Sequence, residues 1–127
     1  MIRTLLLALL ALVSLSGCAG SPDAGSVEAG DDAASEVTAR GRELFAANCA
    51  ACHGESGTGT TSGPPLVHII YEPSHHGDGA FYRAVREGVT PHHWDFGPMP
   101  PVEGLSDADI DHIIGYVREE QRAAGIE

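Results

Sequence analysis

The stretch Cys49-Ala50-Ala51-Cys52-His53 decides how this chain of 127 residues is interpreted. Two thiols at this separation on a helical turn can reach the two vinyl groups of one haem, and the histidine that follows places an imidazole under the iron. The small alanines leave the turn unobstructed. The C-x-x-C-H spacing therefore predicts one covalent haem c, attached through Cys49 and Cys52 and ligated by His53.

Other kinds of site also use paired cysteines. A thioredoxin-like redox pair needs a preceding strand in a βαβ unit, and no strand pattern precedes Cys49. A zinc site needs a second pair of suitably spaced ligands, which the histidines do not supply. A disulfide between Cys49 and Cys52 would be strained and would leave His53 without a role. Haem attachment accounts for all three residues.

Met99 is the candidate for the second axial ligand. It lies in Gly97-Pro98-Met99-Pro100-Pro101, and only Met1 is another methionine. The flanking prolines restrict the backbone, which is a poor setting for a methionine that merely fills core space. Met/His ligation is a standard arrangement that raises the haem potential. The alternative is a second imidazole, from one of five histidines: His68, His75, His76, His92 or His93.

The apolar pattern predicts three helices and no strands. The first has its body at residues 40–48 and begins near Ser35 or Thr38. The second begins at Asp78 or Gly79 and covers residues up to 87, with Gly88 in the stop position. Proline-rich loops separate the helices, and loops of this length in so small a domain indicate that something packs inside them.

The third helix has the clearest signal. Ser106 is followed three residues later by Asp109, which is a carboxylate variant of the capping box. Apolar residues then follow at i, i+3, i+4 and i+7, at positions Ile110, Ile113, Ile114 and Val117.

From residue 38 to residue 123 the chain resembles a class I cytochrome c. The likeness lies in Gly41 and Phe45 of the first helix, the C-A-A-C-H motif, the Gly-Pro-Pro-Leu stretch at residues 63–66, the methionine in a proline-rich loop, and Tyr116. It implies an all-α fold of three or more helices with long loops around one haem. In that family the first and last helices cross with the glycine and aromatic residues in contact, and a proline carbonyl, here of Pro64 or Pro65, accepts from the proximal histidine.

The N-terminus predicts export. Arg3 precedes an apolar run that is too short for a comfortable transmembrane helix. The following Leu15-Ser16-Gly17-Cys18 resembles the lipobox of bacterial lipoproteins, which implies cleavage before Cys18 and a diacylglyceryl group on its sulfur. An ordinary signal peptide is the alternative. Residues 1–17 are then the signal peptide, residues 18–36 a disordered acidic tether, and residues 37–127 the cytochrome c domain.

The charge balance limits the partners. The formal net charge is −11, so nucleic acid is not expected as a partner. The sequence contains no lysine. Docking to redox partner proteins therefore cannot use the ring of lysines that many mitochondrial-type cytochromes c present.

Together these features predict an electron carrier, not an enzyme, held by lipid on the periplasmic or extracellular side of a membrane. Its haem iron would cycle between Fe(III) and Fe(II) in a respiratory or redox chain. One alternative is a peroxidase-like or gas-binding haem protein, which needs an open axial position. Another is a haem-plus-copper binding module, because paired imidazoles suit Cu or Zn. The paired histidines are His75-His76 and His92-His93.

Overall fold

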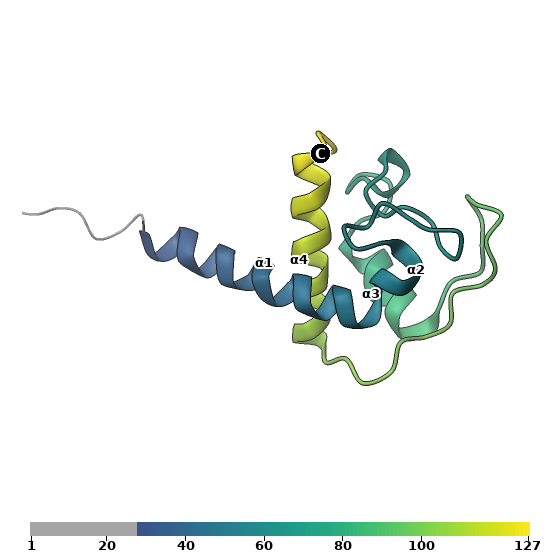
Figure 1. Ribbon diagram of the computed structural model, residues 1–127, viewed down its shortest axis with the longest axis horizontal. Coiled ribbons are helices and arrows are strands. Elements are labelled where there is room, and N and C mark those ends of the chain that lie inside the picture. The colour runs from purple at the N-terminus through teal and green to yellow at the C-terminus, as the bar shows by residue number, and fades with distance from the viewer. Residues whose placement is uncertain (1–27) are drawn as a thin grey trace, which may run out of the picture.

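The computed structural model describes residues 28–127, which form an all-α fold with long loops (Figure 1). The elements are α1 (Glu28–Asn48), α2 (Ala50–His53), a 3-10 turn η1 (Ile69–Tyr71), α3 (Asp78–Glu87) and α4 (Asp107–Ala123). Strand-like pairing among these residues is limited to one isolated bridge, between Val89 and Met99. The predicted fold class is confirmed, and α3 ends before Gly88 as expected.

Helix α1 begins earlier than predicted, at Glu28 and not near Ser35 or Thr38. Residues 28–36, assigned to a disordered tether, are therefore helical, and that part of the prediction is wrong. The low apolar content of residues 28–36 indicated disorder. However, a segment that continues an already anchored helix needs only helix propensity, which the alanines of this segment supply. The rest of the predicted tether and the signal peptide lie outside the described residues.

Helix α4 starts with the predicted capping box. The Ser106 hydroxyl accepts a hydrogen bond from the backbone N–H of Asp109 at 3.1 Å, and the Asp109 carboxylate accepts from the backbone N–H of Ser106 at 3.0 Å. The Ser106 hydroxyl also donates to the Asp109 carboxylate at 2.6 Å, and this bond, together with the one from the Ser106 backbone N–H, lowers the pKa of Asp109 below its ordinary value. The cap sets the first residue of the helix and hence the direction of its apolar face.

Helices α1 and α4 cross in close contact at Gly41 (Figure 1). A Cβ atom on Gly41 would overlap the backbone carbonyl of His112 and lie 2.8 Å from Tyr116 Cβ. One turn further along α1, the ring of Phe45 packs against that of Tyr116 with centroids 5.3 Å apart. The family's expected contact of glycine and aromatic residues is thus present.

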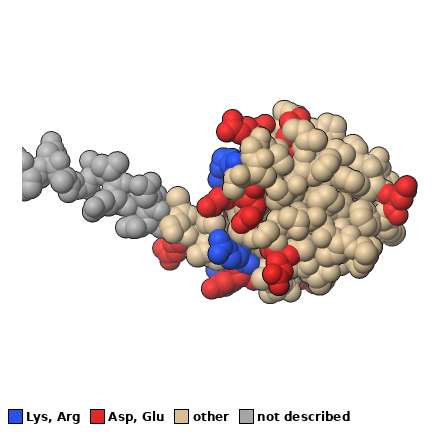
Figure 2. Space-filling model, turned by 45° about the horizontal axis from the view of Figure 1, so that its top comes forward, with Lys and Arg blue, Asp and Glu red and all other residues tan. Residues whose placement is uncertain are grey.

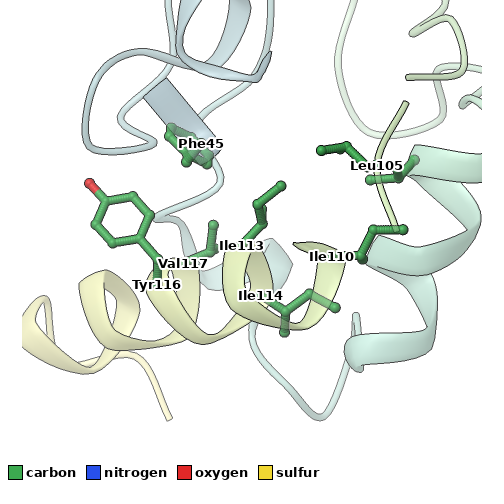
Figure 3. Packing of buried hydrophobic residues seen from close by; sticks show 8 residues of the cluster. Phe45, Leu105, Ile110, Ile113, Ile114, Tyr116 and Val117 are labelled. Atoms are coloured by element: carbon green, nitrogen blue, oxygen red, sulfur yellow. The ribbon is translucent and has the colours of Figure 1, made fainter. Parts of the chain in front are cut away.

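The core lies along the inner face of α4 (Figure 3). Phe45 from α1 and Val85 from α3 pack against it, with Leu105 from the preceding loop. The predicted stripe of α4 is buried along its whole length. The buried apolar residues are Phe45, Val85, Leu105, Ile110, Ile113, Ile114, Tyr116 and Val117.

Two polar residues of α4 continue this buried face. Arg118 is 8% exposed and Gln121 is 1% exposed. The Arg118 guanidinium donates to Asp78 Oδ1 at 2.9 Å and to the Tyr71 carbonyl at 2.7 Å. Gln121 Nε2 donates to the Leu66 carbonyl at 2.8 Å. Side chains of α4 therefore donate hydrogen bonds to backbone carbonyls of the loop between α2 and α3. Those carbonyls would otherwise be left without partners.

We expect Gly41→Ala to lower the free energy of unfolding by about 1–3 kcal/mol, because the methyl group would force the crossing apart. Gly115→Ala is the matched control in the same pair of helices. There a Cβ atom would meet only the exposed Val37 side chain, at the ordinary contact distance of 3.4 Å. That change should be neutral or stabilising by up to about 1 kcal/mol. Denaturation of the haem-loaded variants measures both changes in the free energy of unfolding. Equal losses of stability in the two variants would contradict a tight crossing at Gly41.

Candidate functional site

Cys49 directly follows α1, and Cys52 and His53 lie in α2, so all three residues belong to one helical turn. The backbone N–H of Cys49 donates to the Phe45 carbonyl at 2.8 Å, and that of His53 donates to the Cys49 carbonyl at 2.9 Å. Cys49 is half-buried and Cys52 is exposed, and neither is in a disulfide. The turn therefore carries both thiols and the imidazole at the spacing expected from the sequence.

The thiol of Cys49 differs from that of a reactive redox cysteine. Burial, with a smaller contribution from Cys52, raises the pKa of Cys49 to about 11. Disulfide exchange needs a thiolate, so its cysteines have lowered pKa values. The Cys49 thiol therefore does not have the electrostatics of a nucleophilic redox cysteine.

The imidazole of His53 is buried and oriented by a backbone group. Its Nδ1 lies 2.8 Å from the carbonyl oxygen of Pro64, so Nδ1–H donates and Nε2 is left with its lone pair. This is the hydrogen bond expected from Pro64 or Pro65. The loop that brings Pro64 back packs tightly on α2, since a Cβ on Gly63 would lie 2.9 Å from the Cys52 carbonyl oxygen.

A cavity of about 390 Å³ joins these groups. Cys49 and His53 line it, and so does Met99. Its apolar walls come from α3, α4 and both long loops, and include Leu66, Phe81, Val85, Phe96, Ile113 and Val117. The structure thus brings the predicted proximal and distal ligands into one apolar cavity.

Met99 is held by backbone pairing to the end of α3. Val89 and Met99 exchange two hydrogen bonds, of 2.9 and 3.0 Å. Gly88 precedes this bridge with a positive φ of 77°, and a Cβ there would overlap the Met99 carbonyl oxygen. The flanking prolines were apparent from the sequence, whereas this bridge was missed because it depends on tertiary pairing.

Trp94 supplies an independent test of what the cavity holds. It lines the cavity, and its buried indole nitrogen Nε1 has no hydrogen-bond partner among residues 28–127. Buried donors are rarely left without partners. Haem fits this site, because the Cys49 thiol, the His53 imidazole and Met99 line an apolar space, Cys52 follows on the same turn, and the Trp94 N–H is available to a propionate.

Of the five histidines considered as alternative ligands, four lie in a cluster and His68 lies apart. His75, His76 and His93 each place one ring nitrogen within 4.8 Å of the others, and the His92 and His93 rings are 4.4 Å apart. Desolvation lowers the pKa of His93, and its three histidine neighbours lower it further. His68 lies apart from the cluster, with its ring 5.0 Å from that of Trp94.

Arg118 and Gln121 were also missed, although the sequence holds a signal for them. Each stands one helical turn beyond a residue of the apolar stripe, at i+4 from Ile114 and Val117. A polar residue at such a position is either a break in the stripe or a buried anchor. The carbonyls that make these two residues anchors become visible only in the folded loop.

The predicted lipidation site, Cys18, lies outside the described residues. Within residues 28–127, none of the helices combines the length and the apolar character required to cross a membrane.

Comparison with known proteins agrees with this geometry. The chain matches the cytochrome c family over residues 38–121. It is similar to the cbb3-type cytochrome c oxidase subunit CcoP of Cereibacter sphaeroides, with 41% identity over 91 residues. That alignment covers 69% of this chain but only 29% of the subunit. The chain belongs to the cytochrome c family, whose haem c is attached covalently through cysteines in the C-x-x-C-H position.

Proposed function

We propose that this protein is a membrane-anchored, mono-haem electron carrier whose iron is ligated by His53 and Met99. One observation carries the proposal: Cys49, His53 and Met99 all line a single apolar cavity. Haem bound there supplies one-electron exchange between Fe(III) and Fe(II). The residues of the chain hold both axial positions and transform no substrate.

His53 acts as a rigid ligand. Its Nδ1–H bond to the Pro64 carbonyl fixes the tautomer and the orientation of the ring, which directs Nε2 away from Pro64. The ring is 8% exposed, so water has little access to displace it. A ligand held in this way keeps its geometry in both oxidation states.

Met99 sets the redox preference. A soft thioether stabilises ferrous iron and raises the potential relative to a second imidazole. The bridge to Val89 restrains the Met99 backbone, and prolines on both sides restrain it further. A restrained ligand keeps the axial position filled, which disfavours a peroxidase-like or gas-binding function.

The partners would be redox proteins on the outer side of the membrane. The relative from Cereibacter sphaeroides is an oxidase subunit, which supports a place for this chain in a respiratory chain. The chain has no lysine and a net charge of −11, so a partner would offer a neutral or basic surface. On the face in Figure 2, charged side chains gather near α1, and much of the remaining surface carries no charge. That uncharged area suits contact with a redox protein.

Met99→Ala should abolish the weak far-red charge-transfer band of methionine-ligated ferric haem. It should also lower the reduction potential and let the ferrous protein bind CO, because the axial position opens. Absorption spectra with and without CO, and a redox titration, measure these changes. A wild-type protein that lacks the band and binds CO readily would contradict Met99 ligation.

Two glycine substitutions give a matched control for the positioning of Met99. Gly88 and Gly104 both have positive φ, of 77° and 83°, so an alanine is strained at either position, by about 1–3 kcal/mol. Only at Gly88 would the new methyl group overlap the Met99 carbonyl, since nothing lies within 4 Å of a Cβ on Gly104. Gly88→Ala should therefore weaken the charge-transfer band, and Gly104→Ala should preserve it.

Cys18→Ser should release the protein from the membrane fraction or block its processing. The reason is that a diacyl group on Cys18 would supply the two chains that stable anchoring requires. Fractionation and incorporation of labelled fatty acid measure the effect, with Ser21→Ala as a control outside the lipobox. Unchanged fractionation and processing of Cys18→Ser would refute the anchor.

A further inference from the structure

The cluster of His75, His76, His92 and His93 is not used by the proposed electron transfer. Its members come from two separate segments, the turn before α3 and the loop that the Val89–Met99 bridge closes. Four imidazoles meet where these segments touch, with ring centroids 4.4 to 5.9 Å apart in the contacts among them. Ring nitrogens from segments far apart in the sequence thus come together at one place.

We propose that this cluster is a second metal site, which binds one divalent transition-metal ion and prefers Cu(II) to Zn(II). The ligands are His75, His76 and His93, with His92 beside them as a fourth. Imidazole suits both ions, and Cu(II) forms the more stable complexes. Neither His53 nor Met99 is among these ligands.

The distance between two of the ligand atoms supports an ion between them. The Nε2 atoms of His75 and His93 are 3.3 Å apart and share a hydrogen bond that a metal ion would replace. Two nitrogens bound at about 2.0–2.1 Å are about 3.3–3.4 Å apart on tetrahedral Zn(II) and about 2.8–3.0 Å apart as neighbours on tetragonal Cu(II), so a small movement of the rings serves either ion. The ligand atoms of His75, His76 and His93 all lie within 4.8 Å of one another, so small rotations of the rings bring the third nitrogen into range.

Backbone carbonyls orient two of the rings for binding. Nδ1 of His76 lies 2.7 Å from the Ile70 carbonyl oxygen, and Nδ1 of His92 lies 3.0 Å from that of Thr90. Each ring therefore donates from Nδ1 and keeps Nε2 free for a metal. Histidines that bind metals commonly donate their other nitrogen to a carbonyl in this way.

The turn that carries His75 and His76 is held in place by the protein core. The backbone N–H of His76 donates to the Glu72 carbonyl at 2.8 Å, and the buried Arg118 guanidinium donates to the His76 carbonyl. Half of the site is thus fixed before an ion arrives, which reduces the entropic cost of binding.

The site lies at the haem cavity, because His76, His92 and His93 also line that cavity. A metal ion there would clamp the Met99 loop to the turn before α3. It would also place a positive charge beside the haem site.

The test is a titration of the EDTA-treated, haem-loaded protein with Cu(II) and, separately, with redox-inert Zn(II). Calorimetry should give one site, with Cu(II) bound more tightly, and electron paramagnetic resonance of the copper complex should show nitrogen ligands. His75→Ala and His93→Ala should each weaken binding by at least about 10-fold, as even outer-sphere changes do. Both side chains are exposed, so these variants should fold.

His112→Ala is the matched control, since His112 lies on α4 and is not among the three clustered ligands. It should leave binding unchanged. The proposal is overturned if wild-type protein binds neither ion, or if binding survives in both cluster variants or is lost in His112→Ala. The charge-transfer band of the same samples reports on Met99, so failure of the metal site is distinguishable from failure of the electron-carrier proposal.

Discussion

The close crossing of α1 and α4 at Gly41 is the contact on which the rest of the structure depends. Because the helices meet there, Phe45 packs on Tyr116 one turn later, and Cys49 follows one turn after that. The same helix thus runs directly from the core contact to the thiols. Ile113 and Val117 of α4 line the same cavity as Cys49 and His53, so this contact fixes the helix that carries the haem attachment residues against one wall of the cavity.

The loops depend on the helices and on what fills the cavity. Between α2 and α3, and between α3 and α4, most of the chain has no regular structure of its own. Arg118 and Gln121 hold the first loop by its carbonyls, and the Val89–Met99 bridge holds the second. Leu66 of the first loop and Trp94 and Phe96 of the second line the cavity, where a large apolar group supplies the contacts that a small domain lacks.

The parts predictable from sequence were those encoded locally. The C-x-x-C-H spacing, the capping box at Ser106 and the α4 stripe each need only neighbouring residues, and the structure has all three geometries. The predicted start of α1 was wrong because the low apolar content of residues 28–36 was given more weight than their helix propensity. The Val89–Met99 bridge and the anchoring by Arg118 join residues far apart in the chain, so no local pattern could predict them.

The histidines show the same limit. The pairs His75-His76 and His92-His93 were visible in the sequence and suggested copper or zinc, but not that the two pairs meet. The two pairs meet because the turn before α3 and the loop between Val89 and Met99 lie together beside the cavity. A pair of adjacent histidines on one loop is common, whereas three converging ring nitrogens constitute a candidate metal site.

The central claim is that haem is fixed in this cavity through Cys49 and Cys52. Its most direct test is mass spectrometry of tryptic peptides from the purified protein. The chain has no lysine, so trypsin releases residues 43–83 as one peptide that contains both cysteines. We expect this peptide to carry one haem, bound by thioether bonds at both Cys49 and Cys52. A haem-containing protein whose peptide has two free thiols, and whose haem is extracted by acid and acetone, would contradict it.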